Sequence, residues 1–178
     1  TSIKVSANGT YSGLTNPSKT GYTFTGWYTS DGTKKENGSG IASNSNHTLY
    51  AHWTPNKYKV TFNANGGSGS MGDQMLTYDQ AANLTANAFK KTGYSFAGWN
   101  TKSDGSGTNY SDKASVKNLA ASGTVTLYAR WTANKYTVKF DGNGADELSK
   151  TSMEVTYNST YGELPQPKRD GYNFIGWY

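Results

Sequence analysis

The sequence predicts a mostly β protein, α+β at most, made of small tandem repeat domains of about 75 residues each. Three near-copies of one segment, GYTFTGWY at 21–28, GYSFAGWN at 93–100 and GYNFIGWY at 171–178, follow one another after 72 and then 78 residues. A second segment, LYAHWTPNKYKVTF at 49–62, returns 78 residues later as LYARWTANKYTVKF at 127–140. Apolar and polar residues alternate in these segments with the period of a β-strand.

This register divides the chain into a complete repeat at 55–132 and two partial repeats. The partial repeat at 1–54 lacks its first strand, and the one at 133–178 lacks its closing strands. Because the chain starts and stops inside a repeat, we expect it to belong to a longer protein. A unit of this length can bury a core of its own, so we expect separate beads rather than a continuous solenoid.

Each repeat begins with a strand that directly follows the repeat boundary. Tyr58, Val60 and Phe62 alternate with polar residues and predict one apolar face, and the closing strand repeats this pattern with Leu127 and Trp131. A repeat with few leucines must build its core from aromatic side chains. The predicted core residues are Tyr22, Phe24, Trp27, Trp53, Phe62, Tyr94, Phe96, Trp99, Leu127, Trp131, Phe140 and Trp177.

The GYSFAGWN-type segment predicts a strand with an irregularity. Regular alternation would place Trp99 opposite Tyr94 and Phe96, so we expect a β-bulge at Gly98, and an equivalent bulge in all three copies. Asp31-Gly32 and Asp104-Gly105 supply the turns that follow. The only stretch with helical character is 80–88, where we expect at most a turn of helix.

These motifs, in this order and with these spacings, resemble the Listeria–Bacteroides repeat family, the type represented by the B repeat of internalin B. The resemblance extends over all 178 residues as a half copy, a whole copy and another half. It implies a β-grasp-like domain, arrayed in tandem on large surface or secreted proteins of bacteria. It also implies no catalysis and no defined set of binding residues.

The residues themselves offer no catalytic, cofactor-binding or metal site. Cysteine is absent, which excludes disulfides and Cys-based zinc sites. Gly67, Gly69 and Gly72 match a dinucleotide fingerprint, but DQMLTYDQ after them alternates as a strand, so a flexible hairpin tip is predicted. Asp141, Asn143, Asp146 and Glu147 predict a solvated loop rather than a calcium site, and His47 and His52 predict surface histidines.

Net charge is +5 and uneven, with four basic against two acidic residues in 1–54, eight against four in 55–132 and five against six in 133–178. This uneven charge argues against nucleic-acid binding. Binding to acidic surface polymers stays open as an alternative. No stretch is apolar enough for membrane insertion. Tyrosines on outward strand positions could contact a ligand: Tyr28, Tyr50, Tyr110 and Tyr128.

The sequence therefore predicts a non-enzymatic, extracellular segment, on the cell surface or secreted, that acts as a spacer or stalk and displays adhesive loops. The short connections at 54–57 and 132–135 should hold neighbouring units in a nearly fixed relation. A first alternative is a module that binds cell-wall polysaccharide, host glycan or a host surface protein. A second is self-association by strand addition at the incomplete terminal repeats. No cofactor is expected.

Overall fold

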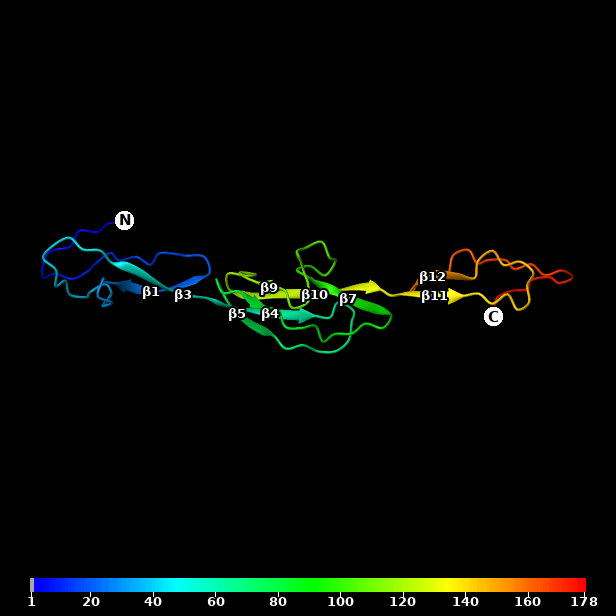
Figure 1. Ribbon diagram of the computed structural model, residues 1–178. Coiled ribbons are helices and arrows are strands. Elements are labelled where there is room, and N and C mark those ends of the chain that lie inside the picture. The colour runs from blue at the N-terminus through cyan, green and yellow to red at the C-terminus, as the bar shows by residue number, and fades with distance from the viewer. Residues whose placement is uncertain (1) are drawn as a thin grey trace. The chain divides into compact units, whose positions relative to one another are not determined.

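The computed structural model describes residues 2–178, and over this range it consists of β-strands, turns and loops without a helix (Figure 1). The mostly β prediction is confirmed. The strands are β1 Tyr22–Tyr28, β2 Lys34–Lys35, β3 Tyr50–Pro55, β4 Lys57–Asn63, β5 Gln74–Thr77, β6 Ala82–Asn83, β7 Tyr94–Asn100, β8 Asn109–Tyr110, β9 Ser115–Val116, β10 Gly123–Ala133, β11 Lys135–Lys139 and β12 Ser152–Thr156. Residues 2–178 contain no helix, and so no helix that could cross a membrane.

The chain forms two compact units, and the boundary between them passes through the middle repeat. Unit 1 contains the residues up to 62 together with 72–86 and 113–127. Unit 2 contains residues 63–71, 87–112 and 128–178. Each unit therefore includes one place where a partial repeat adjoins the middle repeat.

Unit 1 contains a three-stranded sheet in the order β2-β1-β3 and, from the middle repeat, strands β5 and β4 with the first half of β10. β4 and β5 are antiparallel and pair Tyr58 with Leu76. The short strands β6 and β9 form a separate ribbon. Apolar side chains from these elements make the core of the unit: Tyr58, Val60, Leu76, Leu84, Val116 and Leu127, with Tyr11 and Ile41 in the first repeat.

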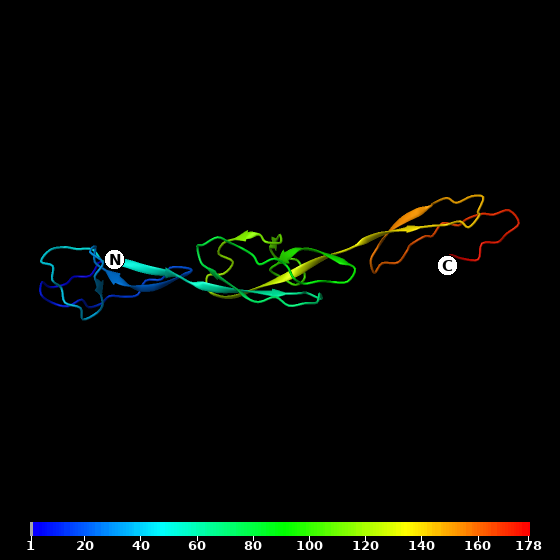
Figure 2. The same cartoon turned by 60° about the horizontal axis from the view of Figure 1, so that its bottom comes forward.

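Unit 2 contains the second half of β10 paired with β7, and β7 paired with β8. Its core includes Phe89, Trp99 and Ala129, and the rings of Phe96 and Trp99 meet edge to face with centroids 4.9 Å apart. β11 and β12 form an antiparallel hairpin, and the two strands lie side by side in both views (Figures 1 and 2). Five strands of the middle repeat belong to one sheet with the order β5-β4-β10-β7-β8.

The predicted bulge forms in the two copies that pair with a closing strand. Between β7 and β10 the register shifts so that Ala97 is the extra residue, and Gly98 takes a φ of 125°. The same shift between β1 and β3 leaves Thr25 as the extra residue. The bulge turns the next indole inward, and Trp99 is completely buried. Within residues 2–178 no strand pairs with the third copy, 171–178, so the bulge predicted there stays a prediction.

The segment 80–88 differs from the prediction of a helical turn. Its residues Ala82 and Asn83 pair as β6 with Val116 and Ser115 of β9. A ribbon between segments more than thirty residues apart satisfies the backbone groups that a short, uncapped helix would leave open. Tertiary pairing therefore decides the conformation of this stretch.

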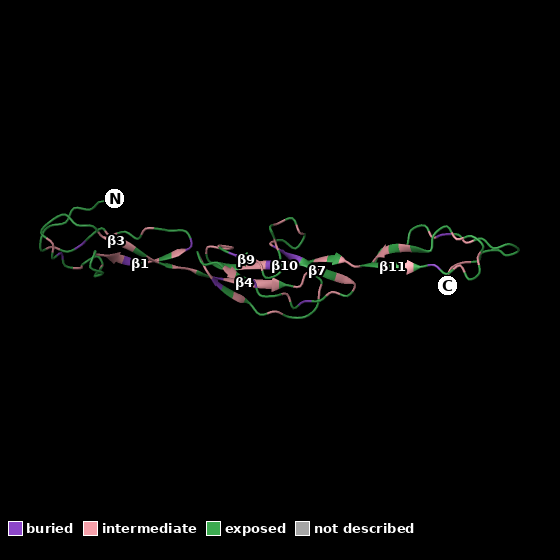
Figure 3. Ribbon diagram, in the orientation of Figure 1, coloured by how far each residue is buried: buried purple, intermediate pink, exposed green. Residues whose placement is uncertain are grey.

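The core predicted from the aromatic pattern is buried to different degrees. Trp99 and Leu127 are fully buried and Phe140 is 9% exposed. The remaining predicted core residues are half-buried: Tyr22, Phe24, Trp27, Trp53, Phe62, Tyr94, Phe96, Trp131 and Trp177. Buried stretches are short and separated by exposed loops (Figure 3). Small, thin sheets offer few positions that are covered on both faces, so large rings are shared between core and surface.

Candidate functional site

The places where one repeat adjoins the next are built from equivalent residues and form the candidate functional site. The first junction lies in unit 1 and consists of Gly21, Tyr22, Asn56, Tyr78 and Asp79. The second junction lies in unit 2 and consists of Gly93, Tyr94, Asn134, Tyr157 and Asn158.

An asparagine between two strands links the backbones of adjoining repeats. The N–H of Asn56, between β3 and β4, donates to the carbonyl of Gly21 at 2.8 Å, and its own carbonyl accepts from the N–H of Tyr78 at 2.8 Å. At the second junction the N–H of Asn134 donates to Gly93 at 2.9 Å, and its carbonyl accepts from Tyr157 at 2.8 Å. The same two hydrogen bonds therefore connect three chain segments at each junction.

The asparagine side chains repeat the same contact as well. The Thr23 hydroxyl donates to Asn56 Oδ1 at 2.6 Å, and the Ser95 hydroxyl donates to Asn134 Oδ1 at 2.6 Å. A hydroxyl is present at both positions although the residue changes from threonine to serine. This hydrogen bond holds the asparagine side chain in one orientation, while the asparagine backbone bonds to the adjoining segments.

A glycine receives an aromatic ring at each junction. Tyr22 and Tyr78 meet edge to face with centroids 5.7 Å apart, and Tyr94 and Tyr157 do so at 5.6 Å. A Cβ on Gly21 would overlap the ring of Tyr78, and φ at Gly21 is +76°. A Cβ on Gly93 would overlap the ring of Tyr157 in the same way, again at a φ of +76°. The glycine before each tyrosine is needed both for its backbone conformation and for this close approach.

A cation lies over the ring of the first tyrosine in each copy. Lys19 Nζ lies 3.8 Å from the ring centre of Tyr22, and Lys91 Nζ lies 4.6 Å from that of Tyr94. In the third copy the guanidinium carbon of Arg169 lies 4.3 Å from the ring centre of Tyr172. These distances are within the range of cation–π attraction, so the basic residue orients the ring that meets the next repeat.

The two junctions differ in charge at one position. At the first junction the Tyr22 hydroxyl donates to Asp79 Oδ2 at 2.7 Å, and Lys117 Nζ lies 2.9 Å from Asp79 Oδ1. Hydrogen bonds from Lys117 and then Tyr22 lower the pKa of Asp79, while the bond to Asp79 raises the pKa of Tyr22. The corresponding residue of the second junction is Asn158, which cannot carry this charge.

The residues considered for metal or acid–base chemistry lie in structural contacts. Asp141 Oδ1 accepts from the N–H of Asn143 at 2.9 Å, Asp146 Oδ2 accepts from the N–H of Asp170 at 2.8 Å, and Glu147 pairs with Lys168 at 3.0 Å. The ring of His47 is hydrogen-bonded to the Tyr11 hydroxyl, and that of His52 stacks on Tyr28. Within residues 2–178, no group of three or more His, Asp or Glu side chains could hold a metal ion.

The hairpin tip with the dinucleotide-like spacing also makes structural contacts. Gln74–Thr77 after it is strand β5, as predicted. Ser68 exchanges backbone hydrogen bonds with Lys90, at 2.7 Å and 3.0 Å. A Cβ at Gly67 would lie 2.7 Å from the Trp131 ring and 2.8 Å from the Lys90 carbonyl, so Gly67 permits a close packing contact.

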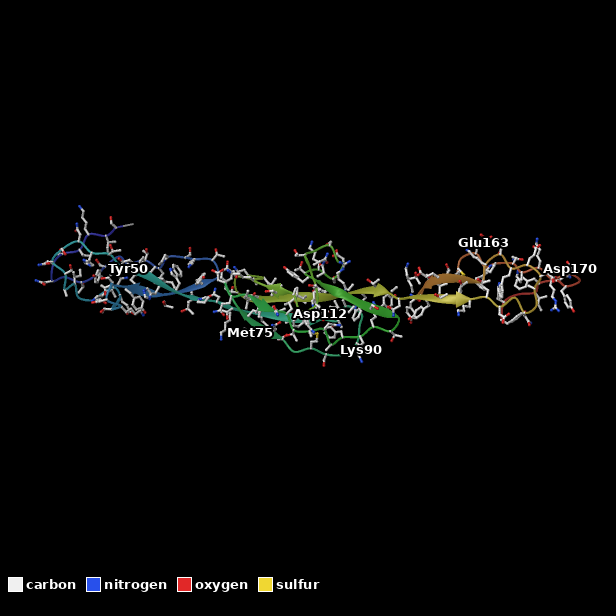
Figure 4. The ribbon with its side chains drawn as sticks, viewed as in Figure 1. Tyr50, Met75, Lys90, Asp112, Glu163 and Asp170 are labelled. Atoms are coloured by element: carbon white, nitrogen blue, oxygen red, sulfur yellow. The ribbon has the colours of Figure 1, made fainter. Side chains whose placement is uncertain are left out.

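Of the four tyrosines proposed as ligand contacts, two lie in unit 1 and two in unit 2. Tyr28 and Tyr50 are cross-strand partners of β1 and β3, and Tyr50 is 51% exposed (Figure 4). The ring of His52 lies 4.1 Å from that of Tyr28 in a stacked arrangement. Tyr110 pairs with Trp99 and Tyr128 with Asn100, so these two tyrosines flank β7 and are half-buried.

The sequence reasoning missed Asn100, a completely buried polar residue in unit 2. Its amide nitrogen donates to the carbonyls of Gly105 and Gly107 at 3.0 and 3.1 Å, and Oδ1 accepts from the N–H groups of Lys102 and Gly107 at 2.8 and 3.0 Å. The side chain therefore holds the glycine-rich turn after β7. Tyr28 and Tyr178 occupy its position in the other copies, so the repeats gave no signal for it.

Comparison with known proteins agrees with this repeat architecture. The family model of the Listeria-Bacteroides repeat domain matches residues 1–52, 58–130 and 136–178. The chain therefore belongs to the Listeria–Bacteroides repeat family, and the resemblance seen in its motifs is confirmed. No solved structure matches the chain significantly.

Two curated relatives show the context in which similar repeats occur. A protein of Evansella cellulosilytica with the provisional name Gly-rich membrane protein is 35% identical over 175 residues, which is 92% of this chain and 20% of that protein. Internalin H of Listeria monocytogenes is 39% identical over 136 residues, which is 75% of this chain and 23% of that protein. The chain thus spans about a fifth of the length of these relatives.

Proposed function

We propose that this chain is a non-enzymatic segment of a bacterial surface or secreted protein, in which tandem repeats act as a spacer that sets the position of what they carry. Family membership and the similarity to an internalin and to a protein named for a membrane support this role. The observation that carries it is the recurrence of one set of contacts at both junctions.

The spacer role requires that successive repeats adopt one relative orientation. A linker of one asparagine would otherwise leave neighbouring beads free to rotate about it. Backbone bonds on both sides of Asn56 and the ring of Tyr78 over Gly21 oppose that rotation. Because Asn134, Tyr157 and Gly93 repeat these contacts, each added repeat would advance the array by the same step.

A β-grasp-like fold for each repeat is part of the proposal. The four longer strands of the middle repeat are, in chain order, β4, β5, β7 and β10. In the sheet they lie side by side in the order β5-β4-β10-β7, which is the order 2-1-4-3 when they are numbered along the chain. The segment that joins the second strand to the third contains the short ribbon strand β6 instead of a helix. This strand order is that of a β-grasp sheet and supports the comparison.

The orientation can be measured with paired spin labels, since the chain contains no cysteine of its own. Cysteines at exposed Thr33 in the first repeat and Ser122 in the middle repeat place labels on the two sides of the first junction. We expect a single narrow distance distribution that becomes broad in Gly21→Ala. A broad distribution in the parent chain would contradict a spacer of fixed orientation.

Glycan binding is the second candidate function, and the exposed rings on β1 and β3 favour it. Tyr50 is 51% exposed, and Tyr28 and His52 form a stacked pair beside it. Flat aromatic faces of this kind can stack on sugar rings. Titration of the chain with cell-wall polysaccharides and host glycans, followed by intrinsic fluorescence, tests the proposal. Binding that is lost in Tyr50→Ala would establish it, and silence across the panel would contradict it.

Binding of a host surface protein, and self-association by strand addition, are further proposals. The hairpin of β11 and β12 is a two-stranded sheet, and such a sheet has two edges that can accept a strand. Sedimentation velocity over a range of concentrations tests self-association. A single monomeric species at every concentration would exclude it.

A further inference from the structure

A groove at the second junction has a chemical character that the first junction does not share. It encloses about 410 Å³ and lies entirely within unit 2. Its lining consists of Gly66, Gly67, Ser68, Lys90, Lys91, Thr92, Tyr94, Tyr157 and Asn158. This set contains two lysines, two tyrosine rings and no carboxylate, so the groove is positively charged and partly aromatic.

The two lysines are available to a ligand. Neither takes part in an ion pair within the described residues, whereas Lys59, Lys117 and Lys135 each pair with a carboxylate. Lys90 is exposed, and its side chain is seen on the loop before β7 in Figure 4. Lys91 is half-buried over the ring of Tyr94. The ammonium of Lys91 is thus held in place, while that of Lys90 is free to move toward a bound anion.

The walls of the groove are fixed by the fold. Backbone bonds between Ser68 and Lys90 join the hairpin tip to the loop that carries the lysines. On the other side, Tyr157 is held by the Asn134 carbonyl and by its contact with Tyr94. A site held from both sides loses little conformational freedom on binding.

The equivalent positions elsewhere in the chain lack this character. Lys90 corresponds to Ser18 at the first junction, and Asn158 corresponds to Asp79, whose carboxylate binds Tyr22 and Lys117. In the third repeat the equivalent lysine, Lys168, is paired with Glu147 at 3.0 Å. The middle repeat therefore combines a second lysine with the loss of the acidic group.

We propose that this groove binds an anionic sugar polymer through a carboxylate or sulfate group. Lys90 and Lys91 would pair with the anion, and the exposed part of the Tyr157 ring, a residue that is 39% exposed, would contact the sugar ring. The volume falls within the range of about 300–1,000 Å³ that is typical of small-molecule sites and suits one or two sugar units. Two lysines beside rings are too few for a nucleic-acid backbone, which requires an extended basic surface. The inference goes beyond the spacer role and stands without it.

The test compares two variants of the full chain with equal net charge. Lys90→Ser with Asn158→Asp gives the second junction the residues that the first junction already has, Ser18 and Asp79. Asn158 and Asp79 have φ values of 61° and 64°, so aspartate suits the backbone there. Lys57→Ser with Asn83→Asp makes the same charge change at exposed positions of β4 and β6, outside the groove. Near-UV circular dichroism shows that each variant is folded.

The probes are a heparin dodecasaccharide and an oligogalacturonate, with dextran and a DNA oligonucleotide for comparison, in calorimetric titrations between about 50 and 200 mM salt. We expect saturable binding to at least one anionic sugar. The groove variant should weaken it about tenfold or more and reduce its salt dependence, because one positive charge that attracts the anion is removed and one negative charge that repels it is added. The control variant should bind as the parent does.

Each other outcome overturns the proposal. No binding of either anionic sugar, or equal weakening in both variants, would show that the groove is not the site. Equal binding of DNA that the groove variant also loses would show a general polyanion site, and binding of dextran with the same affinity would show that the anion plays no part. A preference between the two sugars distinguishes a sulfate from a carboxylate ligand.

Discussion

Asn100 shows how one buried residue can determine a loop. It is completely buried, and its amide bonds to the carbonyls and N–H groups of the turn after β7. We expect Asn100→Ala to lower the free energy of unfolding by about 2–3 kcal/mol, since several buried backbone groups lose their partner at once. Urea denaturation followed by tryptophan fluorescence measures this. Asn83→Ala, at an exposed position of β6, serves as control and should change stability little.

Gly93 is the residue on which the second junction depends most directly. Alanine there would have to adopt a φ of +76° and would also overlap the ring of Tyr157. Gly171 is the matched control, because its φ is +74° and nothing lies within 4 Å of its Cβ position. We expect Gly171→Ala to cost only the backbone strain of about 1–2 kcal/mol, and Gly93→Ala to cost more and to change the NMR signals of the Tyr157 ring. Equal effects of the two variants would show that the ring contact contributes nothing.

At the scale of elements, the first junction should respond to pH in a way that the second cannot. The folded-state pKa of Asp79 is lowered, so its contribution is present above the ordinary carboxyl pKa of about 4 and is lost as pH falls toward the folded value. The pKa of Tyr22 is raised, so its contribution is present below about 10 and is lost as pH rises through the folded value. The first junction is therefore most stable between these limits.

Ultraviolet absorbance or NMR titration of the tyrosines tests this difference. Tyr22 should ionise at a higher pH than an ordinary tyrosine, and Asp79→Asn should return it toward the ordinary value. A Tyr22 pKa that does not change in Asp79→Asn would contradict the hydrogen bond as its cause.

The strands and bulges could be predicted because they depend on local pattern. Alternation over Tyr58, Val60 and Phe62 indicated β4, and a glycine before Trp99 indicated the bulge. The ribbon of β6 and β9 could not be predicted, since it joins segments separated by β7 and β8 and neither partner has a distinctive pattern. The bulge predicted for the third copy stays a prediction, because no strand within residues 2–178 pairs with 171–178.

The junctions were predictable only in part. The repeated Asn-Lys-Tyr of 56–58 and 134–136 marked short connections between repeats. The partners across each junction, Tyr78 and Tyr157, occur as Thr-Tyr-Asp and Thr-Tyr-Asn, and nothing local identifies them as the rings that cover a glycine. A contact that joins three separate segments becomes visible only when the strands have brought them together. The difference between Asp79 and Asn158 could likewise be interpreted only from the structure, which places Asp79 against Tyr22 and Lys117.

For the whole molecule, the junction contacts predict that neighbouring repeats unfold together. Each compact unit contains part of the middle repeat and a junction, so the middle repeat shares contacts with residues on both of its sides. Repeat arrays of this kind gain stability from the interfaces between nearest neighbours as well as from each repeat. When those interfaces are strong, the parent chain should melt in one cooperative transition whose calorimetric and van't Hoff enthalpies agree.

The double variant Gly21→Ala with Gly93→Ala removes the ring contact at both junctions and should divide the melt into separate transitions. Gly123→Ala with Gly171→Ala introduces two alanines at φ values of +74°, where nothing lies within 4 Å of either Cβ position. It should lower the melting temperature and preserve a single transition, because its strain is local to each repeat. Differential scanning calorimetry of the three chains distinguishes these results. Two transitions in the parent chain would mean that the repeats are independent beads, and a spacer of fixed orientation would then require another origin.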